Sequence, residues 1–232
     1  MKRVLLKLSG EALANGSADI YDNAFVDKVA EALVQCTRLG YELAVVVGAG
    51  NIWRGRQGGE MDRIAADRMG MLATVINSIC LADAITRAGG KSKVMTSVPM
   101  EPFAEGYSSE KADACLKDGY IVVFGAGLGI PFLSTDTAGA VRSSEIGADA
   151  MLMAKNVDYV YTDDPRKNPD AKKLEKVRAS EVLAMNLKAI DATATAFCLS
   201  TGMPIRIFGF KNPEDIIKAV RGEVSGTVIT PD

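Results

Sequence analysis

The sequence of 232 residues contains no histidine. This absence excludes Ser-His-Asp and Cys-His nucleophilic chemistry and removes the commonest general base and a common metal ligand. A Walker motif, G-x-x-x-x-G-K followed by Ser or Thr, is also missing, which argues against an ordinary P-loop enzyme. Phosphoryl transfer is compatible with both absences, because it needs mainly positioning and charge neutralisation.

Other features that would indicate a macromolecular partner or a metal are also scarce. The formal net charge is −2 and the basic residues are spread along the chain, so a small-molecule substrate is favoured over nucleic acid or a membrane surface. The apolar run within residues 1–10 is short and interrupted by Lys7, unlike a signal peptide or a membrane span. Cys36, Cys80, Cys115 and Cys198 form no C-x-x-C pair, so we expect reduced thiols in a cytoplasmic protein and no metal site.

Strand-like and helix-like runs alternate along most of the chain. The expected strands are 3–8, 43–47, 93–96, 120–124, 150–154, 159–161 and 205–208. The expected helices are one over 25–34 that stops by Gly40, 62–87, 110–117, one capped by Asp136, 187–201 and 214–220. This alternation predicts an α/β sandwich with a mainly parallel sheet. No linker interrupts it, so any two halves share one sheet, with the second half starting near Gly125.

Two of the expected strands run into turns that contain glycine. The first ends in Lys7-Leu8-Ser9-Gly10 and the second in Gly48-Ala49-Gly50-Asn51. Small residues let backbone N–H groups approach phosphate oxygens, and a lysine at such a turn can stabilise charge during phosphoryl transfer. Each turn alone could be ordinary. A nicotinamide site is disfavoured, because Trp53 replaces the third glycine of G-x-G-x-x-G.

Four further positions could serve a nucleotide, and each also has a purely structural explanation. Arg54 could bind a phosphate or be solvated, and Asp67 could bind a ribose or be surface charge on a helix. The cluster 134–136 could be an N-cap, and the segment 161–165 could be a turn or part of an adenosine pocket. Their order along the chain, rather than any single position, favours a kinase.

That order resembles the amino acid kinase superfamily, and within it the bacterial UMP kinases, over essentially the whole chain. The most diagnostic block is Asp67-Arg68-Met69-Gly70-Met71-Leu72-Ala73-Thr74, which the amino-acid-specific relatives lack. The other matching blocks are KLSGEAL (7–13), GNIWRG (50–55), PFLSTD (131–136), KNVD (155–158), YTDDP (161–165) and PIR (204–206). The resemblance implies a single domain with a three-layer αβα sandwich.

The resemblance implies transfer of the γ-phosphoryl group of ATP, with Mg2+, to UMP in pyrimidine nucleotide (CTP and UTP) biosynthesis. Lys7, Arg54 and Asp136 would be the catalytic residues, and Mg2+ would be held mainly by the ATP phosphates. The residues implied for ATP binding are Lys7, Leu8, Ser9, Gly10, Gly50, Arg54, Asn156, Tyr161 and Asp164. Those implied for UMP are Ala49, Asp67, Leu128, Gly129, Ile130, Pro131, Phe132, Leu133, Ser134 and Thr135.

The resemblance also implies how the domain is divided and regulated. Residues of about 1–125 would mainly bind UMP and phosphates, and those of about 126–232 the ATP nucleoside. A homohexamer inhibited by UTP is expected. The segment 14–19 departs from the glycine-rich pattern that accompanies GTP activation in many members, so that property does not follow. Two alternatives stay open: a kinase of this superfamily with another acceptor, and a non-catalytic nucleotide- or oxyanion-binding protein.

Overall fold

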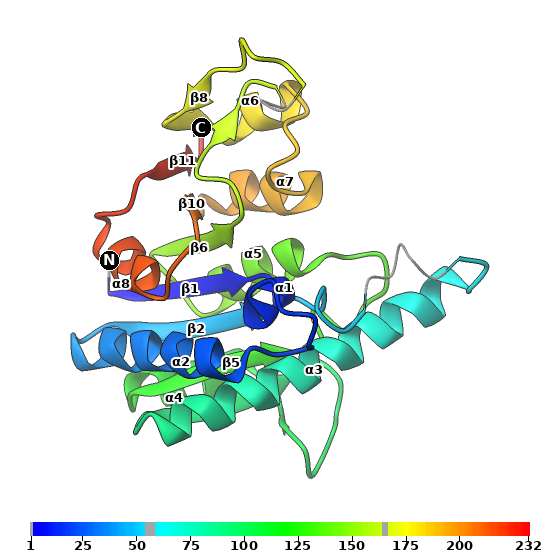
Figure 1. The fold of residues 1–232 in the computed structure, drawn as a ribbon, viewed down its shortest axis with the longest axis vertical. Helices are drawn as coiled ribbons and strands as arrows, with labels where there is room; N and C mark the ends of the chain where they lie inside the picture. The colour runs from blue at the N-terminus through cyan, green and yellow to red at the C-terminus, as the bar shows by residue number, and fades with distance from the viewer. Residues whose placement is uncertain (1, 54–58, 164–166) are drawn as a thin grey trace.

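The computed structural model describes residues 2–53, 59–163 and 167–232, which form an α/β fold (Figure 1). Arg54 and Asp164 lie outside the described residues. The strands are β1 (Arg3–Leu8), β2 (Glu42–Val47), β3 (Lys91–Thr96), β4 (Glu105–Gly106), β5 (Tyr120–Gly125), β6 (Ala150–Lys155), β7 (Val160–Tyr161), β8 (Lys173–Leu174), β9 (Lys176–Arg178), β10 (Ile205–Gly209) and β11 (Gly226–Thr230). The helices are α1 (Gly10–Ala14), α2 (Asn23–Arg38), α3 (Arg63–Arg87), α4 (Ser109–Lys117), α5 (Thr135–Glu145), α6 (Ala179–Ala184), α7 (Ala192–Thr201) and α8 (Glu214–Arg221).

Nine strands form one continuous sheet in the order β4-β3-β5-β2-β1-β6-β10-β11-β9. Its neighbouring strands pair in parallel, except for the antiparallel pair β10 and β11. Helices pack on both faces, as parallel strands joined by crossovers require. The α/β sandwich with a mainly parallel sheet expected from the alternation, and the three layers implied by the family resemblance, are therefore confirmed.

Two apolar cores lie on opposite faces of the sheet. One is built by α2, α3 and α8 with Val4, Leu6 and Leu8 of β1. The other is built by α4, α5, α6 and α7 with Leu5 of the same strand. Because successive side chains of a strand alternate between faces, Lys7 shares the face of Leu5 and points toward the layer that contains α5.

The registers of the parallel strands bring several chain turns to one edge of the sheet. Leu8 pairs with Val47 and Lys7 with Met153, so both glycine turns and Lys155 follow directly at that edge. Strand β5 joins the same edge beside β2 and ends at Gly125. Ligands of open α/β sheets bind outside the carboxyl ends of the strands, so this edge is where a site is expected.

Several expected elements differ from the structure. The helix expected over 187–201 begins only at Ala192, because the Asp191 side chain accepts a hydrogen bond from the backbone N–H of Ala194 and caps it there. The expected cap Asp136 is wrong: Ser134 caps α5, and Asp136 lies in its first turn. Strands β4, β8, β9 and β11 and helices α1 and α6 were not expected, since each spans six residues or fewer.

Helix α3 is the longest helix of the described chain and contains Gly70 without interruption. By length and composition alone it could cross a membrane, but half of its most apolar 18-residue stretch is buried inside the structure. Its buried residues Leu81, Ala82, Ala84 and Ile85 belong to the first core. The helix therefore packs on the sheet like a core helix, although its outer face also has apolar side chains.

Candidate active site

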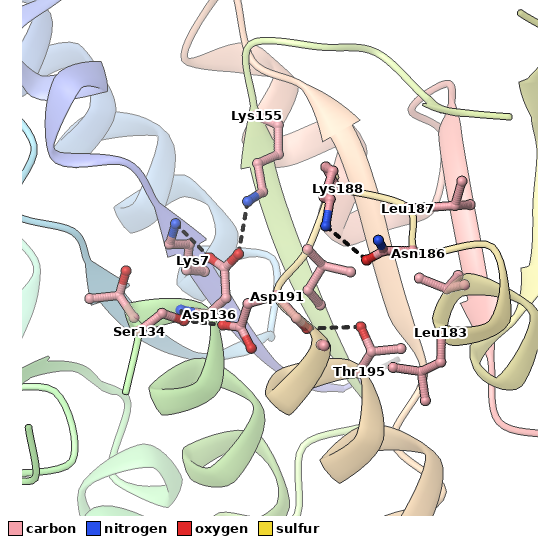
Figure 2. A pocket seen from close by; sticks show the side chains of 14 residues that line it. Lys7, Ser134, Asp136, Lys155, Leu183, Asn186, Leu187, Lys188, Asp191 and Thr195 are labelled. Atoms are coloured by element: carbon pink, nitrogen blue, oxygen red, sulfur yellow. Dashed lines mark hydrogen bonds and ion pairs between the residues drawn. The ribbon is translucent and has the colours of Figure 1, made fainter. Parts of the chain in front are cut away.

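A charged cluster of the buried residues Lys7 and Asp136 and the partly buried Lys155 lies at the carboxyl edge of the sheet (Figure 2). The ammonium nitrogen of Lys7 lies 2.8 Å from Asp136 Oδ1, and that of Lys155 lies 2.9 Å from Oδ2. Only 8% of Asp136 is exposed. Two cations on one carboxylate leave the cluster with a net positive charge, which favours an anionic ligand.

Burial and charge act in opposite directions on these groups. Burial alone would raise the pKa of Asp136, but the two ammonium groups outweigh it and hold that pKa below its usual value. Burial lowers the pKa of Lys155, helped by the charge of Lys7 and opposed by Asp136. Asp136 therefore stays ionised and is suited to orient lysines, not to act as a general base.

The first turn of α5 fixes Asp136 in position. The Ser134 hydroxyl accepts hydrogen bonds from the backbone N–H groups of Asp136 and Thr137, each at 3.1 Å. The same hydroxyl donates to Asp191, which also accepts from the Thr137 hydroxyl at 3.1 Å. Asp191 thus connects the N-termini of α5 and α7, so the helix that carries Asp136 is held from both sides.

A cavity of about 710 Å³ opens over this cluster. Its charged lining residues are Lys7, Lys155, Lys188, Asp136 and Asp191, three cations and two anions, as Figure 2 shows for the labelled side chains. The backbone N–H groups at the start of α5 add the positive end of a helix dipole beside it. This cavity has the charge and size to accept a polyphosphate.

The two glycine turns are packed tightly against each other beside the cluster. A Cβ atom at Gly10 would lie 2.5 Å from the Gly48 carbonyl oxygen and 2.8 Å from the Gly50 nitrogen, so only glycine fits there. The buried amide of Asn77 donates to the Gly48 carbonyl at 2.7 Å and to Asn51 Oδ1 at 2.8 Å. The turns are therefore held rigidly, as binding through backbone N–H groups requires.

A second cavity, of about 270 Å³, lies next to the first. It is lined by residues of the second glycine turn, of α3 and of the segment before α5, among them Ala49, Gly50, Asp67, Gly127, Leu133, Ser134 and Thr135. Ser134 and Thr135 line both cavities, so the two meet at the N-terminus of α5. A donor in one cavity and an acceptor in the other would therefore come together beside Lys7.

Asp67 is held in place within this second cavity. Both carboxylate oxygens accept from Arg63 Nε at 2.9 Å, and Oδ2 also accepts from the backbone N–H of Phe132 at 2.8 Å. The guanidinium of Arg63 lies 5.6 Å from the centroid of the Phe132 ring. The carboxylate thus joins α3 to the segment before α5.

The remaining residues expected in the site are more dispersed. The turn 128–132 precedes Leu133 without itself lining the second cavity. Leu8 is the last residue of β1, and Ser9 is the N-cap of α1. Asn156 lines a separate cavity of about 450 Å³ with Glu11 and Lys211. Tyr161 lines another, of about 460 Å³, which shares Asn186, Leu187 and Lys188 with the first.

Sequence reasoning missed three features of the first cavity: Lys155, Asp191 and the segment 186–188. Lys155 ends a strand beside β1, so its position at the same edge as Lys7 follows only once the strand order is known. Asp191 is the N-cap of α7, but the helix expected over 187–201 included this residue, so it was not recognised as a cap.

Within 2–53, 59–163 and 167–232, no group of three acidic or thiol side chains is placed to hold a metal ion. Both oxygens of Asp136 are occupied by ammonium groups, and those of Asp191 by hydroxyl and N–H donors. These residues suit a metal that arrives already bound to phosphate oxygens better than one held by a protein cage.

The buried cluster, the two adjoining cavities and the rigid glycine turns define a phosphotransferase. The family model described as "Amino acid kinase family" matches residues 2–209, and the chain belongs to this family.

Solved structures agree with this assignment. The chain is 37% identical to a UMP kinase from Bacillus anthracis, with a TM-score of 0.94 and coverage of 100% of this chain and 96% of the other. It is 31% identical to a UMP kinase from Ureaplasma parvum, with a TM-score of 0.93 and coverage of 99% and 98%. It is 25% identical to a uridylate kinase from Archaeoglobus fulgidus, with a TM-score of 0.75 and coverage of 99% and 100%.

Replacing Lys7 with alanine is expected to lower the turnover of ATP-dependent phosphoryl transfer by at least about a hundredfold, since one preorganised cation beside the transferred group is lost. Steady-state kinetics of the folded variant would measure it. Lys2→Ala is the matched control, because Lys2 is an exposed lysine at the other end of β1, paired with Glu42. Turnover of Lys7→Ala close to that of Lys2→Ala would remove Lys7 from the chemistry.

Proposed function

We propose that the protein is a UMP kinase that transfers the γ-phosphoryl group of ATP to UMP, giving UDP and ADP in pyrimidine nucleotide biosynthesis. The observation that carries this proposal is the meeting of the two cavities at Ser134 and Thr135, beside the cluster of Lys7, Asp136 and Lys155. The full-length similarity to UMP kinases supports UMP as the acceptor.

The chemistry suits a site without histidine. A phosphate monoester loses its second proton near pH ~6, so the UMP phosphate is already a nucleophile at neutral pH and needs no general base. An oxygen of that phosphate bonds to the γ-phosphorus as the bond to the bridging oxygen breaks, and ADP leaves with the electron pair. Repulsion between the two anions is the main obstacle, and Lys7 and Lys155 are positioned to offset it.

The proposed binding assignments put ATP on the side of the first cavity and UMP in the second, although Gly50 lines the second cavity and Asn156 and Tyr161 line neighbouring ones. The ATP phosphates would bind at Lys7, Leu8, Ser9, Gly10 and Gly50. Arg54 would lie near the transfer point, and Asn156, Tyr161 and Asp164 would contact the nucleoside. UMP would occupy the second cavity, with its ribose on Asp67, its phosphate near Ala49, and 128–135 around the uracil and phosphate. The occupied oxygens of Asp136 and Asp191 support Mg2+ binding through the ATP phosphates.

ADP release from ATP and Mg2+ should be strong with UMP and weak with CMP, AMP, an amino acid, carbamate or isopentenyl phosphate. The Asp67 carboxylate of the second cavity suits a ribose, which disfavours the acceptors that have none, and the proposed contacts of 128–135 with the uracil would distinguish UMP from CMP and AMP. A parallel assay of these acceptors would measure the preference. Turnover of another acceptor would indicate a different kinase of the family, and turnover of none would favour a binding protein.

Asp67→Asn should raise the KM for UMP about tenfold to a hundredfold and change the KM for ATP little, because charged hydrogen bonds to the ribose are lost. Steady-state kinetics with each substrate varied would test this. Asp83→Asn is the matched control: Asp83 also pairs with an arginine one helical turn away on α3, but outside both cavities. Equal changes in both KM values would contradict the ribose assignment.

We also propose that the chain assembles as a homohexamer, is inhibited by UTP and works in the cytoplasm, where its four free cysteines stay reduced. The outer face of α3 supports assembly. Met69, Leu72, Ile76 and Ile79 recur there at helical spacing and are 40–52% exposed. A row of large apolar side chains of this kind is typical of an interface between subunits.

Ile76→Glu should therefore lower the molecular mass in solution from that of a hexamer to that of a smaller species, because a charge would be buried in the interface. Light scattering coupled to gel filtration would measure the mass. The control is Leu39→Glu, which changes an exposed apolar residue at the end of α2. A wild-type monomer, or an unchanged mass for Ile76→Glu, would rule out this face.

A further inference from the structure

Helix α5 contains a second buried charge, Arg142, which the proposed chemistry does not use. Only 6% of the residue is exposed, although a buried cation is costly unless it is paired. Its Nη1 donates to Glu145, and its guanidinium carbon lies 3.7 Å from the centroid of the Tyr107 ring. The Tyr107 hydroxyl donates to the same carboxylate at 2.7 Å, which closes a ring of contacts.

The other side of the guanidinium leads toward the second cavity. Arg142 Nη2 donates to Ser97 Oγ at 2.9 Å, and that hydroxyl donates to the Gly127 carbonyl oxygen at 2.6 Å. Gly127 lines the cavity that contains Asp67. A buried arginine on α5 is thus connected through one serine to the wall of the proposed acceptor site.

The turn at Gly127 has a backbone that needs such support. Ala126, Gly127 and Gly129 have φ values of +63°, +56° and +74°, and Ala126 is a residue type for which this region is uncommon. The Ala126 N–H donates to the Thr74 hydroxyl at 2.9 Å, and Ser97 holds the following carbonyl. The turn is therefore fixed from α3 on one side and from α5, through Ser97, on the other.

We propose that Arg142 is a positioning residue for the acceptor: through Ser97 it fixes the Gly127 turn relative to the cluster of Lys7, Asp136 and Lys155. Asp136 and Arg142 belong to the same helix, six residues or ~9 Å apart along its axis. A single rigid element thus sets the distance between the transferred group and the acceptor. This inference rests on the proposed function and deepens it.

The geometry requires arginine and not merely a positive charge. The guanidinium donates to Glu145 and Ser97 from different nitrogens while its plane covers the Tyr107 ring. A lysine ammonium has no planar fork to meet these partners together. Arg142→Lys should therefore behave like Arg142→Met and restore little.

The primary test is Ser97→Ala, which breaks the connection without removing the buried charge. The KM for UMP should rise about threefold to tenfold, which is the change in affinity that the loss of one hydrogen bond produces. The kcat and the KM for ATP should stay within about twofold of wild type. Ser143→Ala is the matched control, since the hydroxyl of this buried serine of α5 donates to the Gly139 carbonyl of its own helix and not to Ser97 or Gly127. It should leave all three constants unchanged.

A double-mutant cycle separates positioning from a general loss of stability. Arg142→Met should raise the KM for UMP at least as much as Ser97→Ala, and adding it to Ser97→Ala should raise that KM little further. If the arginine variants do not fold, Ser97→Ala alone decides. An unchanged KM for UMP in Ser97→Ala, or an equal rise in both KM values, would overturn the proposal.

Hydrogen exchange of the free protein keeps this test apart from the proposed function. Faster exchange of the backbone amides at 127–129 in Ser97→Ala, with unchanged exchange elsewhere on α5, is the result expected without any ligand. Unchanged exchange at 127–129 would refute the connection to Arg142. A wild-type protein that does not phosphorylate UMP would instead refute the proposed function, while the exchange result would still decide the positioning of the turn.

Discussion

Asp136 lies between two ammonium groups that come from neighbouring strands of the sheet, and the rest of the site depends on this contact. Lys7 lies on β1 next to the first glycine turn, and Lys155 is the last residue of β6. Their side chains converge only because β1 and β6 are adjacent and in register. Without the carboxylate, the buried ammonium group of Lys7 and the partly buried one of Lys155 would repel each other. Removing one partner of a buried pair leaves an uncompensated charge, which costs several kcal/mol. Sheet register and site charge are therefore coupled.

The position of Asp136 depends in turn on how α5 begins. Ser134 caps the helix and donates to Asp191, which caps α7, so one hydrogen-bonded group joins two helix N-termini. Both helices belong to the same apolar core as Met151 and Met153 of β6. Interiors are close-packed and do not deform continuously, so this layer holds the carboxylate in a fixed place. The hydrogen bonds of Ser134 and Asp191 determine how α5 and α7 begin, and the apolar packing of the two helices keeps them in that position.

The sequence was sufficient to predict the strands that position the site, because each is a short apolar run followed by glycine or charge. β1, β2, β5 and β6 were expected within one residue or two of their bounds. The expectations failed where tertiary contacts decide. Asp136 was expected as a cap, but its carboxylate is used by lysines distant in sequence, and the cap falls to Ser134.

The difference between local pattern and tertiary contact also explains which site residues were not predicted. Lys7 and Asp67 could be proposed from local pattern and resemblance. Lys155 enters only through the strand order, and Arg142 only through a ring of contacts among α5, Tyr107 and the end of β3. A charged residue inside a helix pattern is usually solvated, so no local signal distinguishes a buried arginine. Such residues are found from packing rather than from spacing.

The absence of histidine is consistent with this arrangement as a whole. A kinase whose acceptor is a hydroxyl must manage a proton, whereas a phosphate acceptor is already anionic, and the difficulty becomes repulsion. In the proposed site that difficulty would be met by the cations and helix termini, with Asp136 kept ionised between lysines. A pure binding protein would need the positive charge but not a second cavity that meets the first at Ser134 and Thr135. The juxtaposition of a cationic cavity with a second cavity that opens beside it therefore favours group transfer over storage.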